Sequence, residues 1–492
     1  MLQNIFLAFI VAFVVISQAF TPLNPTSGYT YVIEAARQSA WPSCAYRFLS
    51  YPNTCDSVDM WNAAGVNQQW TLVSTGEADT FYLKANCGKY LSYPNDCSNT
   101  KTIDLWSQAG VNQKFRFVKG NNGAFDYYIE AVGRAACDYR YLSFPGPCTT
   151  SSPDHVDFWS GAGENQRFRL YPTGSQSPLV QPVGSSFSCP DPFVWKPRNQ
   201  AEYKIQCTEG GLKLGSSPDL QPGSVFKYEG DCLGGSLPSW AAANDRWAPE
   251  NYESSDAQYN YIFFGDAQAD GKHRIGWAAS KSGPVPAGYS SYSPYYLNLG
   301  EAAGGDIDST VFEDSDGKTY LIWKTDDNNV GSSTTRIFLQ QISLVNGTVT
   351  QLSSPRQLMD STGLWWVDSW VQGGSLVEGP EMLKRNGMYY LFFAAGKYCQ
   401  DTYTEGVARS TSIFGPYEKL PSPLLANGIV GRGRRADGST DQLVGPGHAS
   451  IVPYGSGEYR IVYHASIGAA CNRYAFINKM AFTPDGWPYA DF

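Results

Sequence analysis

A threefold internal repeat in the first third of the chain constrains the fold more than any other feature. A motif of a basic residue, an aromatic residue, Leu, Ser, an aromatic residue and Pro occurs at 47–52, 89–94 and 140–145. A hydrophobic residue, Asp, a hydrophobic residue and Trp follow at 58–61, 103–106 and 156–159. Each copy ends in Asn-Gln-x-Trp or Asn-Gln-x-Phe, at 67–70, 112–115 and 165–168. One copy of roughly 45 residues cannot bury a core alone, so the three are expected to pack around a common axis.

The ending of each copy resembles the Gln-x-Trp motif of ricin-type β-trefoil lectins and carbohydrate-binding modules. The resemblance covers about residues 27–172 and implies a β-trefoil in which the motif aromatic and Gln are structural. The Asp that usually binds sugar in that family has no counterpart, because its segment reads Leu-Ser-Tyr-Pro. Tyr51, Tyr93 and Phe144 are therefore expected either to stack on sugar or to pack the repeats together.

The cysteines suggest a disulfide framework. Two cysteines flank each copy of the first motif at similar spacing, which predicts three pairs within repeats, Cys44–Cys55, Cys87–Cys97 and Cys137–Cys148. In the second domain the order of strands and turns predicts Cys189–Cys207 and Cys399–Cys471, with Cys232 left free. Spacing alone leaves other connectivities open.

The N-terminus predicts secretion. Residues 4–16 form one apolar run, and Ser17-Gln18-Ala19 places small residues before a cleavage point. Residues 1–19 therefore indicate a signal peptide; an anchor helix is the alternative, although the run is short for a hydrocarbon core of about 30 Å. An extracellular location permits disulfides and makes Asn346-Gly347-Thr348 a usable glycosylation sequence, unless it is left unmodified.

Composition limits the class of protein and partner. A chain of 492 residues implies two or three domains, and 14% aromatic residues with 49 glycines favours short strands and turns, an all-β protein. The net charge of −9, without a basic patch, argues against nucleic acid and anionic membranes. The expected partner is a polysaccharide or oligosaccharide, bound by a monomer. A Pro-, Gly- and Ser-rich stretch at 173–187 predicts a linker.

The second domain, 188–492, repeats one arrangement five times. A polar residue stands at the head of a strand, and a hairpin and a second strand follow. The five heads are Asp191-Pro192, Trp247-Ala-Pro-Glu250, Asp306-Ile-Asp308-Ser-Thr, Glu378-Gly-Pro-Glu381 and Gly447-His448. The order and wording of these motifs resemble glycoside hydrolase family 43, a five-bladed β-propeller with an inverting mechanism.

The resemblance assigns roles residue by residue. Asp191 matches the general base, Glu378 the general acid, and Asp308 the carboxylate that orients the acid and keeps it protonated; Asp306 is the reserve candidate for that position. An inverting hydrolase needs one carboxylate to deprotonate water and one carboxylic acid to protonate the leaving oxygen. Taken singly, each of these carboxylates could be a turn or cap residue; in five ordered motifs, catalysis is the better interpretation.

Four more residues are candidates for the substrate cleft. Trp247 is expected to line a sugar subsite or to pack blades, and Glu250 to bind substrate or cap a turn. Trp366, beside Trp365, is expected to form the cleft wall or to lie buried on a neighbouring segment. His448 matches a family histidine near the axis that often helps to hold a central calcium ion or its waters. The reaction itself requires no cofactor.

The resemblance implies a secreted enzyme acting on plant-type or algal polysaccharide. Arabinose-containing polymers lead, because the Trp-Ala-Pro-Glu and Asp-Ser-Thr forms look nearest to arabinan-active members; β-xylosidase and exo-β-1,3-galactanase activities are alternatives. Related fructan hydrolases are disfavoured because their Asn-Asp-Pro, Arg-Asp-Pro and Glu-Cys motifs are absent at Asp191, Asp308 and Glu378. The alternative of another class is a catalytically inactive lectin.

Overall fold

The computed structural model describes most of the chain from residue 25 onward. The described residues are 25, 27–28, 30–35, 48–61, 66–94, 103–119, 127–134, 136–144, 156–173, 188–221, 223–234, 238–242, 246–254, 258–289, 292–300, 302–330, 334–364, 376–420, 423–427, 430, 432–434, 439–455, 457–482 and 486–491. The predicted signal peptide, nearly all of the predicted linker, and Trp365 and Trp366 lie outside them. Within these ranges, no helix is both long and apolar enough to span a bilayer.

In the part of the N-terminal domain that the structure describes, twelve strands pair with one another, four from each repeat. The strands are β1 (Thr30–Ala35), β2 (Phe48–Ser50), β3 (Asp59–Trp61), β4 (Gln69–Ser74), β5 (Thr80–Ala85), β6 (Tyr90–Ser92), β7 (Asp104–Trp106), β8 (Lys114–Lys119), β9 (Tyr127–Ala131), β10 (Tyr141–Ser143), β11 (Asp157–Trp159) and β12 (Arg167–Thr173). Short 3-10 turns are η1 (Val66–Gln68), η2 (Val111–Gln113), η3 (Val132–Arg134) and η4 (Glu164–Gln166). The outer strands pair in the order β1-β4-β5-β8-β9-β12 and back to β1, which closes a ring, and β2-β3, β6-β7 and β10-β11 form three equivalent hairpins.

The repeat motifs build the core of this ring. The motif aromatics Trp70, Phe115 and Phe168 are completely buried. The motif glutamines donate to the serine hydroxyls of the first motif over 2.6–2.8 Å, in the pairs Gln68–Ser50, Gln113–Ser92 and Gln166–Ser143. Both motifs therefore serve one purpose, a buried hydrogen bond that ties the end of each repeat to its hairpin.

The predicted sugar-stacking role of the aromatics in the first motif is wrong. Tyr51, Tyr93 and Phe144 are at most 4% exposed. Each packs edge-to-face on the core aromatic of its own repeat, at centroid distances of 5.1, 5.2 and 5.9 Å. The alternative interpretation, packing of the repeats, is confirmed; a ring buried in this way has no face left for sugar.

Disulfide pairing within each repeat is also wrong where the structure tests it. Cys55 is bonded to Cys87, which joins the first repeat to the second and excludes both Cys44–Cys55 and Cys87–Cys97. The turn that carries Cys55 lies against the next repeat, because Lys89 donates to the Cys55 carbonyl over 2.6 Å. Cys137 is disulfide-bonded, but the predicted partner Cys148 lies outside the described residues. In the second domain, Cys189–Cys207, Cys399–Cys471 and a free, buried Cys232 are confirmed.

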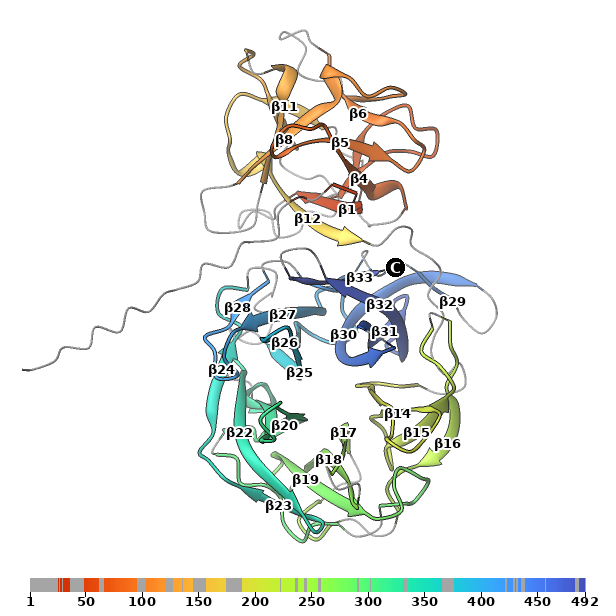
Figure 1. Cartoon of the computed structure of the whole chain (residues 1–492), viewed down its shortest axis with the longest axis vertical. Coiled ribbons are helices and arrows are strands. Elements are labelled where there is room, and N and C mark those ends of the chain that lie inside the picture. The colour runs from red at the N-terminus through yellow and green to blue at the C-terminus, as the bar shows by residue number, and fades with distance from the viewer. Residues whose placement is uncertain are drawn as a thin grey trace, which may run out of the picture.

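The second domain is a five-bladed β-propeller, as predicted (Figure 1). Blade 1 holds β13 (Phe193–Trp195), β14 (Tyr203–Cys207), β15 (Lys213–Ser217) and β16 (Lys227–Asp231); blade 2 holds β17 (Trp247–Glu253), β18 (Asn260–Ala267) and β19 (His273–Ser280). Blade 3 holds β20 (Asp306–Glu313), β21 (Thr319–Thr325), η5 (Asp327–Val330), β22 (Arg336–Val345), β23 (Thr348–Gln351) and β24 (Arg356–Asp360). Blade 4 holds β25 (Val377–Arg385), β26 (Met388–Ala395), β27 (Thr404–Ser410) and β28 (Glu418–Lys419); blade 5 holds β29 (Arg432–Arg434), β30 (Thr440–Tyr454), β31 (Glu458–Ile467), β32 (Arg473–Phe482) and β33 (Pro488–Asp491).

One residue in, or just before, each innermost strand has a left-handed backbone. The φ angles are +49° at Asp191, +47° at Ala248, +54° at Asp308, +51° at Gly379 and +54° at His448. In β17, β20, β25 and β30 the strand register shifts at this point. Such a bulge bends the strand and redirects its side chain. The five inner strands therefore share one local distortion, and it is this distortion that carries Asp191, Asp308 and His448 to the centre.

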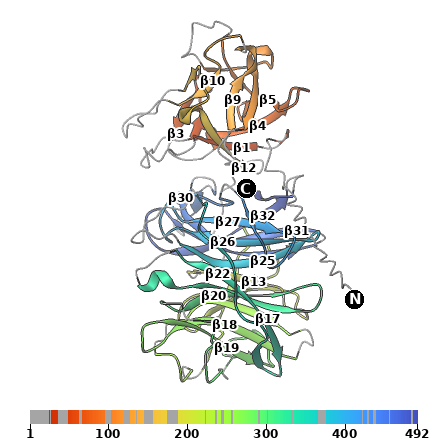
Figure 2. The same cartoon turned by 90° about the vertical axis from the view of Figure 1, so that its left-hand side faces the viewer.

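The first repeat of the N-terminal domain packs on the propeller. Val32 and Phe48 are at most 2% exposed and belong to one hydrophobic cluster with residues of blades 4 and 5, such as Phe392 and Tyr463. β12 also lies beside β33 (Figures 1 and 2). The N-terminal domain thus sits at the rim of the propeller, next to blade 5, and the two domains share part of a core.

Candidate active site

A pocket of about 250 Å³ opens where the inner strands meet. Its lining includes Asp191, Asp308 and Glu378, together with Trp247, His448 and Arg473. The structure therefore brings together five of the residues singled out from the sequence. Trp366 lies outside the described residues, and Glu250 is not among the residues that line this pocket.

Asp191 is held in a cationic, hydrogen-bonding environment. Its Oδ1 accepts from Arg473 over 2.9 Å and lies 3.3 Å from His448 Nδ1, and its Oδ2 accepts from the Thr208 hydroxyl over 2.7 Å. Burial alone would favour the neutral acid, but the Arg473 guanidinium and His448 outweigh it and hold the pKa of Asp191 well below its usual range. Asp191 is therefore a carboxylate at any pH near neutrality.

A neutral histidine fixes the backbone of Asp191. Burial lowers the pKa of His464 to about 4. Its Nδ1 accepts a hydrogen bond from the Asp191 backbone N–H over 3.1 Å, which places the ring proton on Nε2. The 3.4 Å approach of Nδ1 to Asp191 Oδ1 is therefore not an ion pair. The ring stacks on Tyr403 with an interplanar angle of 6°, and this packing locks its orientation.

Asp308 joins two neighbouring blades. It is 6% exposed, and its Oδ2 accepts from the backbone N–H of Gly379 over 3.1 Å. Burial raises the pKa of Asp308 to about 6, against the opposing influence of His448 and Lys324. Asp306, the reserve candidate, accepts from the Trp323 indole over 3.0 Å and does not line the pocket. The bulge between Ile307 and Thr310 separates these two carboxylates.

Glu378 receives two donors at the start of β25. Tyr403 donates its hydroxyl to Oε1 over 2.7 Å, and Lys324 donates its ammonium to Oε2 over 3.1 Å. These contacts fix both oxygens of Glu378 relative to blades 3 and 4. Tyr403 is completely buried, so the orientation of Glu378 is built into the propeller core.

A buried chain of charges connects Glu378 to the tryptophan of the pocket. Lys324, 1% exposed, lies 3.3 Å from Asp326 Oδ1, and Asp326 Oδ2 lies 2.7 Å from His273 Nδ1. The His273 ring in turn lies 4.2 Å from the ring of Trp247. Burial disfavours the ammonium, but Glu378, Asp326 and Asp308 outweigh it and raise the pKa of Lys324, which is therefore charged.

Glu250 lies in a second layer beneath the pocket. A cavity of about 20 Å³, room for about one water, runs along the axis there and is lined by three residues from each inner strand. Glu250 and Glu381 both face it. Burial and the charge of Glu381 raise the pKa of Glu250, and burial raises that of Glu381 to about 8. This placement does not support substrate binding by Glu250; the side chain closes the axis and accepts from the Val311 N–H over 3.2 Å.

The residues around His448 do not fit a directly bound calcium ion. Calcium takes six to eight oxygen ligands. In the described ranges no group of three or more acidic, histidine or cysteine side chains is placed to hold a metal, and His448 itself contacts Asp191.

Sequence reasoning missed several residues of the site, namely Thr208, Lys324, Tyr398, Tyr403, His464 and Arg473. They come from second or third strands of the blades, or from connecting loops, outside the five motifs. Two disulfides stand beside them: Cys189–Cys207 next to Asp191 and Thr208, and Cys399–Cys471 next to Tyr398 and Arg473. The small number of histidines was one signal that could have pointed to some of these residues. The chain has four, and three of them, His273, His448 and His464, lie at the site.

Comparisons with known proteins agree with this architecture. The model of Glycosyl hydrolases family 43 matches residues 180–488. The chain is 24% identical over 333 residues to the beta-D-galactofuranosidase xynD of Aspergillus niger, covering 65% of this chain and 78% of that protein. It is 23% identical over 316 residues to a probable arabinan endo-1,5-alpha-L-arabinosidase C of Aspergillus flavus, covering 61% and 90%.

A solved structure supports the fold. The crystal structure of a thermostable family-43 glycoside hydrolase superimposes with a TM-score of 0.52 at 24% identity and covers 64% of this chain and 96% of that one. The family match spans more than half of the sequence and contains Asp191, Asp308 and Glu378. The chain therefore belongs to glycosyl hydrolases family 43 and is a glycosidase that hydrolyses O-glycosyl bonds.

Proposed function

We propose that the protein is a secreted, inverting glycoside hydrolase that acts on arabinose-containing polysaccharide. The observation that carries the proposal is the convergence of Asp191, Asp308 and Glu378 on one pocket, each in a different environment. Inversion needs a charged base and a protonated acid on opposite sides of the sugar.

Asp191 is the general base. Arg473 and Thr208 keep its carboxylate charged and oriented, and His464 holds its backbone. A water molecule deprotonated by Asp191 attacks the anomeric carbon. The proton moves to the Asp191 carboxylate, whose negative charge is then lost, so the attraction of Arg473 also favours later return of this proton to solvent.

Glu378 is the general acid. The glutamic acid gives its proton to the leaving glycosidic oxygen as the bond to the anomeric carbon breaks. Asp308 is a positioning residue, because it binds the N–H of Gly379 next to Glu378 and adds a negative charge that favours the protonated acid. Lys324, which donates to Glu378, opposes the effect of that charge. Asp308 therefore favours the protonated form of Glu378, and Lys324 favours its charged form.

The sugar is proposed from the pocket and from the relatives. A pocket of about 250 Å³ suits one or two sugar units. Trp247, packed on His273, offers a ring for stacking, and Tyr398, 48% exposed, stands over Arg473 at the rim. Two of the relatives are named for furanosides, an arabinan and a galactofuranoside. These names favour a furanose over a pyranose, with arabinofuranose first.

The N-terminal domain is proposed to be a β-trefoil of ricin type. The closed six-strand ring with three hairpins supports this assignment. The most exposed equivalent aromatics are Trp61, Trp106 and Trp159, at 43%, 55% and 52%. If the domain binds sugar, these rings replace the buried first-motif aromatics as the stacking surfaces. The disulfides support an oxidising, extracellular location.

A substrate panel tests the proposal. The purified protein is incubated with nitrophenyl α-L-arabinofuranoside, β-D-galactofuranoside, β-D-xyloside and β-D-galactoside, and with linear arabinan, xylan and β-1,3-galactan. Release of arabinose, with the inverted anomer as first product by NMR, is expected. Faster release of xylose or galactose would show that this sugar, and not arabinose, is the preferred one. A retained anomer would refute the inverting mechanism. Binding of polysaccharide without release of sugar would indicate that the protein is an inactive lectin.

A further inference from the structure

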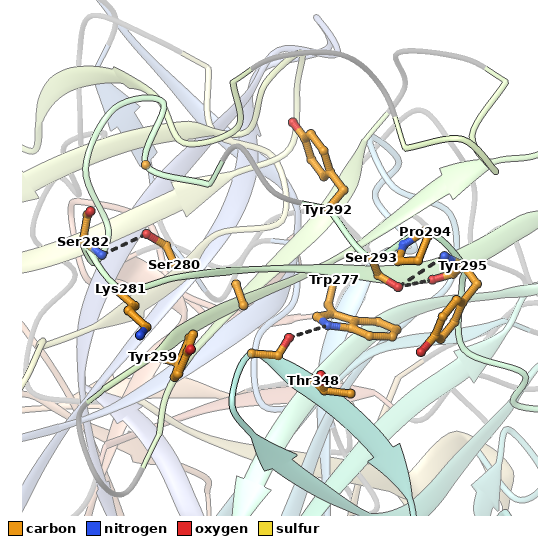
Figure 3. Close-up of a pocket in the computed structure, with 13 residues that line it drawn as sticks. Tyr259, Trp277, Ser280, Lys281, Ser282, Tyr292, Ser293, Pro294, Tyr295 and Thr348 are labelled. Atoms are coloured by element: carbon orange, nitrogen blue, oxygen red, sulfur yellow. Dashed lines mark hydrogen bonds between the residues drawn. The ribbon is translucent and has the colours of Figure 1, made fainter.

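A second concave site lies on the outer part of the propeller, between blades 2 and 3. We call it the rim groove and define it by Tyr259, Trp277, Lys281, Tyr292, Tyr295 and Thr348 (Figure 3). Its volume is about 510 Å³, twice that of the catalytic pocket. Trp277 comes from β19, Tyr259 from the turn before β18, and Thr348 from β23.

The rim groove faces away from the catalytic pocket. His273 begins β19 and lines the catalytic pocket, whereas Ser280 ends the same strand and lines the groove. Seven steps along a strand span about 23 Å. β17 runs in the same way, from Trp247 at the pocket toward the turn that carries Tyr259. Anything bound in the rim groove is therefore outside the reach of the catalytic carboxylates.

The lining combines aromatic rings with unused hydroxyl groups. Tyr295 is 56% exposed and packs edge-to-face at 5.6 Å on Trp277. Trp277 is only 4% exposed, so it supports Tyr295 from beneath and offers no free face itself; its indole N–H donates to the Gly347 carbonyl. Figure 3 shows Trp277 between Tyr259 and Tyr295. Within the described ranges, the hydroxyls of Tyr259, Tyr295 and Thr348 have no protein partner.

The charge of the groove also points to a sugar. In a chain of net charge −9, the described lining contains no acidic side chain and one cation, Lys281, over the Tyr259 ring at 5.1 Å. Without a carboxylate the groove cannot perform acid–base hydrolysis. Rings that cover the C–H faces of a sugar, with hydroxyl and ammonium donors for its oxygens, suit retention of a carbohydrate.

We propose that the rim groove is a non-catalytic carbohydrate-binding site that retains a segment of the polysaccharide substrate on the propeller face opposite the catalytic pocket. The choice of polysaccharide rests on the proposed function; the site itself does not. A bound segment raises the local concentration of the same polymer near the enzyme without touching the reacting bond.

The test is affinity electrophoresis of the full-length protein in native gels cast with arabinan, xylan or galactan. Wild type is compared with Tyr295→Ala combined with Tyr259→Ala, and with Tyr228→Ala, an exposed tyrosine on β16 that does not line the groove. The reference protein and both variants all carry Asn346→Gln. A glycan on this exposed residue, next to Gly347, would otherwise begin at the edge of the groove.

The double variant is expected to bind about tenfold more weakly than wild type, with Tyr228→Ala unchanged. Turnover of a small nitrophenyl glycoside should be the same in all three proteins, which also reports correct folding and tests the proposed function separately. Equal retention of the double variant and wild type would overturn the proposal. It would also be overturned if restoring Asn346 made retention depend on its glycan and not on Tyr295, because the groove would then hold the protein's own glycan.

Discussion

The backbone N–H of Gly379 donates a hydrogen bond to Oδ2 of Asp308 over 3.1 Å. The residue after Glu378, on blade 4, is thus fixed by a carboxylate on blade 3. This bond makes Asp308 a positioning residue as well as a charge, and the two contributions can be separated, because an asparagine at 308 keeps an acceptor oxygen and loses only the charge.

Asp308→Asn is therefore expected to shift the pH profile more than it disturbs the structure. Without the negative charge the protonated form of Glu378 is less favoured, so the basic limb of kcat moves to lower pH. We expect kcat to fall by about 100-fold or more at neutral pH. Asp306→Asn on the same strand is the control, since Asp306 binds Trp323 outside the pocket. An unmoved basic limb in Asp308→Asn would contradict the role.

The same substitution should stabilise the fold at neutral pH. The pKa of Asp308 is raised from 3.8 to about 6, so its ionisation opposes folding above that range. The penalty is present at pH 7 and disappears as the pH falls below about 4, where the carboxyl is protonated in both states. Asp308→Asn should gain up to about 3 kcal/mol at pH 7 and nothing at pH 3.5. Denaturant melts at the two pH values measure the difference.

Lys324→Met should move the pH profile in the opposite direction. The ammonium bonded to Glu378 favours its charged form, so its removal lets the acid stay protonated to higher pH. The basic limb of kcat should therefore rise in pH. Asp326 loses a partner at the same time, but retains His273. A shift to lower pH, or a profile identical to wild type, would show that Lys324 does not act on the acid.

Glu378→Gln and Asp191→Asn should differ in their response to the leaving group. Without the acid, a nitrophenyl glycoside that needs little protonation should keep far more activity than arabinan does. Without the base, both substrates should lose activity by several orders of magnitude. Parallel kcat/KM measurements on the two substrates give the comparison. Equal losses in Glu378→Gln would refute its assignment as the acid.

Phe48→Ala should loosen the contact between the two domains. Phe48 is 2% exposed in a core shared with blades 4 and 5, and Tyr90 is its counterpart in the second repeat, away from that core. Truncation of a buried Phe costs about 3 kcal/mol or more. Phe48→Ala should therefore lower the melting temperature and increase the radius of gyration in small-angle scattering, whereas Tyr90→Ala should not. Nitrophenyl glycoside turnover should survive in both.

The parts of the molecule that depend on short sequence motifs were predictable from the sequence. Asp191, Asp308 and Glu378 stand in motifs, and each inner strand brings its motif to the axis. Lys324 and Arg473 were not predictable in this way, because they reach the pocket from neighbouring strands whose register depends on the closed ring of blades. Lys324 in particular follows four hydrophobic residues, Tyr-Leu-Ile-Trp, and lies in a strand that is buried along nearly its whole length.

The spacing of the cysteines gave a wrong prediction of the disulfide pairing where two repeats are in contact. Equal intervals between cysteines say that the copies are alike, but they do not say whether a bond closes within a copy or between copies. The Cys55–Cys87 bond depends on the hairpin turn leaning on the next repeat, a contact between segments that the spacing of one copy cannot reveal.

The left-handed residue on each inner strand includes Ala248, whose methyl group has no part in catalysis. A non-glycine residue in this conformation costs of order 1–3 kcal/mol, so a strained alanine would be without purpose if the conformation served only the reacting groups. The left-handed conformation is instead required by the propeller fold, because all five inner strands adopt it whatever residue is present. Position 248 thus lines the axial cavity without a functional group, and Ala248→Asp would add a further carboxylate there without any new backbone conformation.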